Sequence, residues 1–277
     1  MHNPLLLASL RYALMDMDGV LYRGNNPQPG LSEFFAFVER AGINYLLLTN
    51  NSTQSAQDYS LKLQKMGVAV PASRIVTSGQ AAAAYVQREA PEGCGIYVVG
   101  MPPLREALFN SSGDERYYFD DKNPRFVVQG GDFNLTYETV KRACLLIRAG
   151  AKFVATNADP LFPSEEGLIP GAGSIGALLE VSSGQKPLVI GKPEPAMYEL
   201  ALEQLGAPRD QTVMLGDNLL TDIEGANRLG LTTILTLSGV THPAEYAQSS
   251  IKATMDFPGL PELTAAWENA LEKAQGL

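Results

Sequence analysis

Histidine and cysteine are scarce in this sequence, which contains two of each among 277 residues. With only His2 and His242, a histidine-based catalytic triad or a multi-histidine metal site is very hard to build. Cys94 and Cys144 lie far apart and form no C-x-x-C pair, so neither a zinc site nor a disulfide framework is indicated. Any acid-base chemistry must therefore rest on carboxylates or lysine.

Positive charge and long hydrophobic runs are missing as well. The formal net charge is -9 and no segment is rich in Lys and Arg, which argues against binding to nucleic acid or to an anionic membrane. Because no uninterrupted apolar run reaches about 18 residues, no membrane span is expected. The apolar stretch at residues 5–10 lacks the basic flank and the cleavage site of a signal peptide, and we expect a cytoplasmic protein.

What the sequence does contain is a regular alternation of short apolar runs with longer segments of helical spacing. Continuously apolar runs bounded by turn residues are typical of parallel strands covered on both faces. We expect strands at 12–15, 45–48, 96–99, 126–128, 153–155, 188–190, 213–215 and 233–235. Helical spacing predicts helices at 31–40, 56–66, 137–149, 195–205 and 221–229. This alternation predicts an α/β fold with a Rossmann-like parallel sheet.

Polar side chains gather directly after four of the expected strands. In chain order these groups are Asp16 with Asp18, Thr49 with Asn50 and Asn51, Lys192, and Asp217 with Asp222. Ligands bind outside the carboxyl ends of parallel strands, so the groups converge if their strands are neighbours. Nothing comparable follows the strands expected between 96 and 155. We therefore predict a catalytic core formed by residues 1–78 and 184–277, with residues 79–183 as an inserted α/β domain.

The pair Asp16 and Asp18 can divide two catalytic roles. Residues two apart in a strand point to the same face, so both carboxylates would address one site. An unperturbed Asp has a pKa of about 3.9, whereas a carboxyl group that donates a proton at neutral pH needs a much higher one. If a metal ion keeps Asp16 ionised, Asp16 is a candidate nucleophile and Asp18 a candidate general acid and then base.

Asp217 adds a third carboxylate, and oxygen ligands without histidine point to Mg²⁺. Mg²⁺ commonly takes only one or two carboxylates, which leaves room for a phosphate ester. Lys192 would supply positive charge, while the Thr49 hydroxyl and the backbone N–H groups of Asn50 and Asn51 could bind phosphate oxygens. Asp222, with Asn218 beside the metal ligands, would orient Lys192 or a water molecule from outside the coordination shell.

These segments resemble the four motifs of the haloacid dehalogenase superfamily: D-M-D-G-V-L at 16–21, L-T-N-N-S at 48–52, G-K-P at 191–193 and G-D-N-L-L-T-D-I at 216–223. Over nearly its whole length the chain is similar to the p-nitrophenyl phosphatase, phosphoglycolate phosphatase and pyridoxal phosphatase branch, including a large α/β cap. The resemblance implies a Mg²⁺-dependent phosphatase with an aspartyl-phosphate intermediate on Asp16. It further implies that Asp16, the backbone carbonyl of Asp18, and Asp217 bind the metal.

Two alternatives are weighed against this interpretation. The segment 171–176 matches the G-x-G-x-x-G pattern of dinucleotide-binding proteins, but residues 164–170 read as a polar loop and not as the buried strand that the pattern requires. We expect a tight turn into a helix there. The second alternative is a noncatalytic protein of the same fold that binds a phosphorylated metabolite, which the intact Asp16, Asp18, Lys192 and Asp217 disfavour.

The substrate is predicted only as a small phosphorylated metabolite: p-nitrophenyl phosphate in vitro, and a sugar phosphate or phosphoglycolate-like compound in vivo. Asn157, Asp159 and Phe162 are candidate contacts to the leaving group, because they follow the strand expected at 153–155. No basic residue in that loop favours a second anionic group on the substrate. The resemblance also suggests a homo-oligomer that forms through the cap.

Overall fold

The computed structural model describes residues 3–109, 115–164, 166–274 and 276. The chain divides into two compact units, a core unit of residues 1–49, 57–76 and 192–277 and an inserted unit of residues 50–56 and 77–191. The boundary expected at residue 184 differs from this division, because the strand at Leu188–Val189 pairs within the sheet of the inserted unit. Residues 50–56 also group with the inserted unit.

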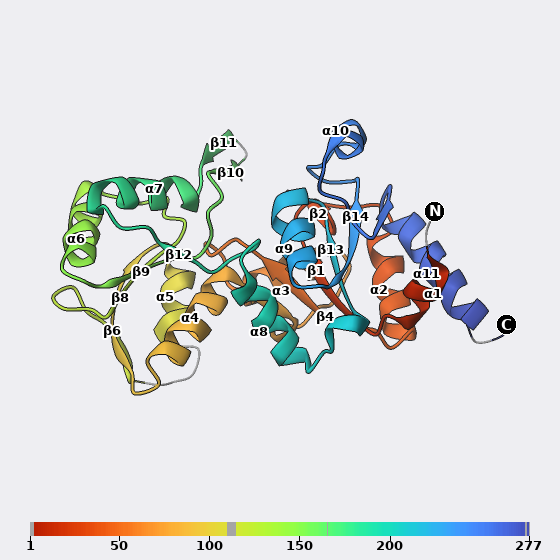
Figure 1. Ribbon diagram of the computed structural model, residues 1–277, viewed down its shortest axis with the longest axis horizontal. Coiled ribbons are helices and arrows are strands. Elements are labelled where there is room, and N and C mark those ends of the chain that lie inside the picture. Colours follow the sequence, from red (N-terminus) through yellow and green to blue (C-terminus); the bar gives the residue numbers. More distant parts are fainter. Residues whose placement is uncertain (1–2, 110–114, 165, 275, 277) are drawn as a thin grey trace. The chain divides into compact units, whose positions relative to one another are not determined.

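The core unit is built on a six-stranded sheet with the strand order β15-β14-β13-β1-β4-β5 (Figure 1). The strands are β1 (Tyr12–Asp16), β4 (Asn44–Thr49), β5 (Ile75–Thr77), β13 (Thr212–Gly216), β14 (Thr232–Thr236) and β15 (Met255–Phe257). β1 pairs in parallel with β4 and with β13, and in this register Asp16 lies opposite Leu48 while Met15 lies opposite Leu215. Asp16, Thr49 and Asp217 therefore emerge at the same edge of the sheet.

Helices cover both faces of this sheet. Figure 1 shows α2 and α11 on one side and α8 and α9 on the other. Trp267 of α11 packs against Phe37 of α2 with ring centroids 5.7 Å apart, and both side chains are buried. The helices of the unit are α1 (Pro4–Ser9), α2 (Leu31–Arg40), α3 (Ala56–Lys65, from Gln57 on), α8 (Pro195–Leu205), α9 (Gly225–Arg228), α10 (Pro243–Gln248) and α11 (Leu260–Ala274).

The helix expected at 221–229 is only partly correct. A π-helical turn at Leu219–Glu224 comes first, and α9 follows it as a short α-helix. Asn218 begins the turn, since its Oδ1 accepts hydrogen bonds from the N–H groups of Leu220 and Thr221. A helix that starts with wide turns places its first residues differently from a regular α-helix, and this segment carries Asp222.

The inserted unit contains a second sheet, with the parallel strand order β12-β9-β8-β6-β7. The strands are β6 (Cys94–Val99), β7 (Tyr117–Phe119), β8 (Phe126–Gln129), β9 (Lys152–Ala155) and β12 (Leu188–Val189). Its helices are α4 (Ser78–Glu89), α5 (Pro102–Phe109), α6 (Tyr137–Arg148) and α7 (Ala172–Ser183). Apolar side chains of α6 and α7 pack on one face of the sheet around Val127 and Phe153. The predicted inserted α/β domain thus has its own core.

The prediction of a polar loop at 164–170 is partly wrong. β10 (Leu161–Ser164) and β11 (Gly167–Pro170) form an antiparallel hairpin, so a strand does precede Gly171. β11 is mostly exposed, however, and belongs to a two-stranded sheet. Gly171 directly precedes α7, as expected for a tight turn into a helix. The exposed strand before it is not the buried strand that a dinucleotide-binding fold requires.

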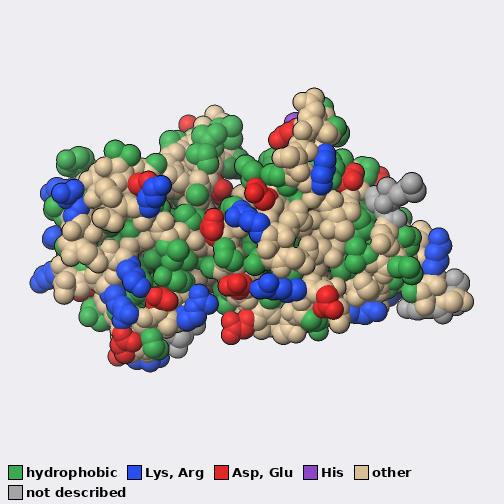
Figure 2. Space-filling view, viewed as in Figure 1, with side chains coloured by type: hydrophobic (Ala, Val, Ile, Leu, Met, Phe, Trp, Pro, Cys, Tyr) green, Lys and Arg blue, Asp and Glu red, His purple; other side chains and the backbone are tan. Residues whose placement is uncertain are grey.

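Exposed apolar side chains gather on parts of the inserted unit. In Figure 2 hydrophobic side chains lie over the β10–β11 hairpin and along α7, and the exposed ones include Leu161, Leu168, Leu178 and Val181. The predicted self-association through the cap stays a prediction. None of the described helices has the length and apolar character needed to cross a membrane.

Candidate active site

A tight turn directly after β1 positions the first two carboxylates. The carbonyl oxygen of Met17 accepts hydrogen bonds from the N–H groups of Leu21 and Tyr22, and a short hairpin of β2 (Tyr22–Arg23) and β3 (Asn26–Pro27) follows. β1 ends at Asp16, so Asp18 lies in the turn and not in the strand. The expected alternation of strand side chains therefore does not apply to this pair, although the charge of Asp18 still acts on Asp16.

Lys192 joins Asp16 to Asp222. Its Nζ donates to Asp16 Oδ1 at 2.5 Å and to Asp222 Oδ1 at 2.7 Å. The side chain of Lys192 is 2% exposed and that of Asp222 is 1% exposed. Burial alone would lower the pKa of Lys192, but the two carboxylates raise it well above its usual range. Lys192 is thus a fixed cation within the site.

Asp222 serves as a support for the neighbouring groups. Its Oδ2 accepts hydrogen bonds from the backbone N–H groups of Asp217 and Asn218, while its Oδ1 accepts from Lys192. Tyr198 of α8 is fully buried and donates its hydroxyl to the carbonyl oxygen of Thr221 in the π-helical turn. Both carboxylate oxygens of Asp222 are therefore engaged within the protein, and its role outside the metal coordination shell stays a prediction.

Two glycines enclose the carboxylate of Asp217. A Cβ atom added to Gly19 would lie 2.0 Å from Asp217 Oδ2, and one added to Gly239 would lie 1.8 Å from it. Gly19 also has a φ of 90°, which other residues rarely adopt. The N–H of Val240 donates to Asp217 Oδ2 at 2.7 Å. The backbone thus approaches this carboxylate as closely as only glycine permits.

The charges of this cluster suit a divalent cation. Oxygen atoms of Asp16, Asp217 and Asp222 all lie within 4.8 Å of one another. When all three carboxyl groups are ionised, they and the single ammonium group leave two negative charges in a largely buried place. Burial raises the pKa of Asp16 to about 7. Burial, and after it the charges of Asp16 and Asp222, raises the pKa of Asp217 well above its usual value. Within the described residues no hydrogen bond reaches Asp16 Oδ2 or Asp217 Oδ1, so the predicted ligand atoms are available to Mg²⁺.

The other predicted phosphate and substrate residues lie partly in the inserted unit. Thr49 ends β4 in the core unit, whereas Asn50 and Asn51 belong to the inserted unit. Asn50 Nδ2 donates to Asp159 Oδ2 at 3.0 Å, and Asn157 Nδ2 donates to the Asn50 carbonyl oxygen at 2.6 Å. Asn51 Oδ1 accepts from the N–H of Thr53 in a local turn. The structure thus ties Asn50, Asn157 and Asp159 together, and their roles toward a substrate stay predictions.

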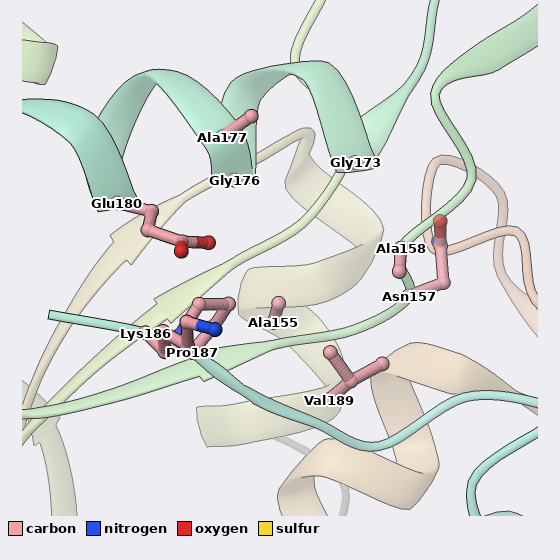
Figure 3. A pocket seen from close by; sticks show the side chains of 10 residues that line it. All are labelled: Ala155, Asn157, Ala158, Gly173, Gly176, Ala177, Glu180, Lys186, Pro187 and Val189. Carbon is pink, nitrogen blue, oxygen red and sulfur yellow. The ribbon is translucent and has the colours of Figure 1, made fainter.

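A pocket of about 270 Å³ lies in the inserted unit beside the same loop. Asn157 and Ala158 line one end, and α7 contributes small residues such as Gly173 and Gly176 (Figure 3). At the other end, Glu180 on α7 and Lys186 lie on facing sides of the pocket (Figure 3). Phe162 does not line this pocket and packs instead against Phe133, with ring centroids 5.3 Å apart.

Comparison with known proteins establishes the family. The model of haloacid dehalogenase-like hydrolases matches residues 13–112, and a second HAD-hydrolase-like model matches residues 189–263. An acid sugar phosphatase from Staphylococcus saprophyticus is 37% identical over 90% of this chain and 95% of its own. The chain belongs to the haloacid dehalogenase-like hydrolases.

Further relatives agree with this assignment and show the class of reaction. A dihydroxyacetone phosphatase from Corynebacterium glutamicum is 35% identical over 92% of this hydrolase and 91% of its own chain. The crystal structure of a 4-nitrophenylphosphatase from Thermotoga maritima superposes with a TM-score of 0.89 at 37% identity, covering 95% of this chain and 99% of that chain. The hydrolase is therefore a phosphatase that acts on phosphoric monoesters.

Tyr198, Gly239 and Val240 also belong to the site of this hydrolase, although no sequence pattern singled them out. Gly239 and Val240 follow the strand expected at 233–235, where ligands bind in such sheets, but they act through their backbone and show no polar side chain in the sequence. Tyr198 gives no comparable signal, because an aromatic residue on a buried helix face is usually part of the core.

The raised pKa values of Asp16 and Asp217 predict an unusual pH dependence of stability. The folded hydrolase without metal keeps protons that the unfolded chain releases near the ordinary pKa of 3.8. Its free energy of unfolding should therefore fall from about pH 5 to pH 8, by at most about 1.4 kcal/mol per pH unit for each such group. Thermal unfolding in a chelator at several pH values would measure this, and added Mg²⁺ should raise the midpoint most at pH 8.

The variant Asp16→Asn provides the control for this prediction. It removes one of the groups that titrate, so the decline in the midpoint with pH should be less steep than in the unmodified hydrolase. An identical decline in both proteins, or a midpoint that rises from pH 5 to pH 8, would show that these carboxyl groups do not govern the effect.

Proposed function

We propose that this phosphatase hydrolyses small phosphomonoesters with the help of Mg²⁺ through a phosphorylated Asp16. The observation that carries the proposal is the cluster of Asp16, Asp217 and Asp222 beyond the carboxyl ends of β1 and β13, in which Lys192 bonds to Asp16 and Asp222. Such a cluster offers a nucleophile, a fixed cation and oxygen ligands for a metal ion in one place.

In the first step, a carboxylate oxygen of Asp16 forms a bond to phosphorus while the bond to the ester oxygen breaks. The leaving oxygen takes the electron pair of that bond and a proton from Asp18. Burial raises the pKa of Asp18 in spite of the opposing charges of Lys62 and Arg23, which favours its protonated form. In the second step, Asp18 accepts a proton from water as the water oxygen attacks phosphorus and releases Asp16.

The phosphoryl group is negatively charged throughout, so it needs positive partners. Lys192 would donate to one of its oxygens from its position between Asp16 and Asp222, and Thr49 would offer its hydroxyl at the end of the neighbouring strand. Mg²⁺, when bound by Asp16, Asp217 and the Asp18 carbonyl, would supply further charge neutralisation. Asp222 keeps Lys192 and the backbone of Asp217 in place.

We also propose that the substrate is a small phosphorylated metabolite, such as a sugar phosphate or a phosphoglycolate-like compound. The names of the relatives support this choice, since one is an acid sugar phosphatase and another a dihydroxyacetone phosphatase. Asn157, Asp159 and Phe162 remain the candidate contacts to the leaving group in the inserted unit.

Metal removal tests the proposed chemistry. The purified phosphatase should hydrolyse p-nitrophenyl phosphate in Mg²⁺, lose nearly all turnover in a chelator, and regain it when Mg²⁺ is restored. Ca²⁺ should restore little, because it prefers more ligands and longer bonds than this compact oxygen site would offer. Equal recovery with Ca²⁺, or undiminished turnover in the chelator, would contradict the proposal. No turnover with any phosphomonoester would favour a noncatalytic binding protein.

A further inference from the structure

Lys62 is a half-buried lysine of the core unit that the mechanism above does not use. It lies on α3, and its Nζ is 3.9 Å from the centroid of the Tyr22 ring. Tyr22 is 1% exposed and directly follows the turn that carries Asp18. The ammonium group of Lys62 is therefore fixed in a definite place on an aromatic face.

This ammonium group has no hydrogen-bond acceptor in the part of the chain that the structure describes. Across residues 3–109, 115–164, 166–274 and 276, no oxygen atom accepts a hydrogen bond from Lys62 Nζ. An ammonium group has three donors, and an aromatic face attracts its charge without accepting in the manner of an oxygen lone pair. Lys62 is half-buried, and this burial lowers its pKa. Such a group is suited to an anionic acceptor that arrives with a ligand.

The surroundings of Lys62 indicate which part of a ligand it would meet. Tyr22, over whose ring the ammonium group of Lys62 lies, forms an isolated β-bridge with Asp18, and the charge of Lys62 acts on Asp18 more strongly than that of Arg23. Arg23 is already engaged, because its guanidinium group donates to the carbonyl oxygen of Gly239 at 2.8 Å. The cation that acts most strongly on Asp16 is instead Lys192. The site therefore has one cation beside the nucleophile and a different one beside the proton donor.

We propose that Lys62 contacts the leaving group of the substrate and selects leaving groups that carry a carboxylate. The inference rests on the proposed function, in which Asp18 protonates the leaving oxygen, so that a cation near Asp18 stands on the leaving-group side. Lys62 would form an ion pair there, without making or breaking a covalent bond. The loop at 157–162 contains no basic residue for this purpose, and α3 supplies one from a distant part of the sequence.

Phosphoglycolate and 2-hydroxyethyl phosphate are a suitable pair of substrates, because their leaving groups are similar in size and differ in charge. The unmodified phosphatase should have the higher kcat/KM for phosphoglycolate. Lys62→Met keeps an aliphatic side chain over Tyr22 and should lower that value about 10- to 100-fold, mainly through KM. The value for 2-hydroxyethyl phosphate should change less than about threefold. Lys62→Arg should keep most of the preference, and Lys65→Met, at an exposed lysine of the same helix, should change neither value.

Several results would overturn this proposal. Equal losses for both substrates in Lys62→Met would mean that Lys62 acts on the phosphoryl group or on Asp18. A phosphatase that hydrolyses p-nitrophenyl phosphate but does not prefer phosphoglycolate would overturn the role of Lys62 and leave the proposed function intact. Failure to hydrolyse any of the three compounds would refute the proposed function itself. If Lys62→Met unfolds at a much lower temperature than Lys65→Met, the test rests on Lys62→Arg. A folded Lys62→Arg variant that has lost the preference for phosphoglycolate would contradict the ion pair.

Discussion

Replacing Asp16 with asparagine is expected to lower the turnover of p-nitrophenyl phosphate by about a thousandfold or more. An amide cannot form the bond to phosphorus that a carboxylate forms, and it also withdraws one ligand from the metal. The same substitution should not destabilise the fold. It removes a negative charge from a largely buried group of three carboxylates and one ammonium, while its amide oxygen can still accept from Lys192. Turnover in Mg²⁺ should therefore fall, whereas the unfolding midpoint at pH 8 without metal should rise.

Steady-state kinetics and thermal unfolding of the same preparation would check both effects. Asp210→Asn is a matched control, because Asp210 is exposed in the core unit and precedes β13, at the opposite end of that strand from Asp217. It should leave turnover and the unfolding midpoint unchanged. Turnover above a few percent in Asp16→Asn would exclude Asp16 as the nucleophile, provided that Asp16→Ala shows the same residual rate and thus rules out deamidation.

The alternation of apolar runs with helical segments predicted the α/β class and most strands of the two parallel sheets, because buried parallel strands have a simple signature. All eight expected strands are present, including the run at 188–190, which pairs with β9 in the inserted sheet. β5, β7 and β15 were not predicted, and neither were the strands of the β2–β3 and β10–β11 hairpins, each of which has only two to four residues. The contribution of residues 50–56 to the inserted unit is likewise a long-range packing effect that no local pattern reveals.

The charged groups of the site were easier to predict than the groups that hold them. Asp16, Asp217, Asp222 and Lys192 converge as the rule for carboxyl ends of parallel strands requires. Their supports arise from contacts between distant segments, such as the close approach of Gly239 to Asp217. Lys62 is the clearest example: in the sequence it is one lysine on an amphipathic helix, and only the packing of α3 against Tyr22 brings it to the side of Asp18.

Replacing Lys192 with methionine should impair both activity and folding. The ammonium group is 2% exposed and donates to Asp16 and Asp222, so its removal leaves two carboxylates without their shared cation. Breaking a buried ion pair from one side typically costs about 3–5 kcal/mol, which lowers the unfolding midpoint by about 10 °C in a chain of this size. Turnover should fall by about a hundredfold or more, because a positive charge aimed at the phosphoryl group is lost.

A second substitution separates the two effects. Asp222→Asn in the Lys192→Met background removes one of the unpaired carboxylates and should recover part of the lost stability, because the remaining amide oxygen can still accept from the N–H groups of Asp217 and Asn218. It should recover none of the turnover. The difference in unfolding midpoint between Lys192→Met and the unmodified phosphatase should also shrink at pH 5. At that pH the carboxyl group of Asp16, whose pKa is raised, is protonated and neutral. A Lys192→Met variant as stable as the unmodified phosphatase at pH 8 without metal would mean that the ammonium group does not offset these buried charges.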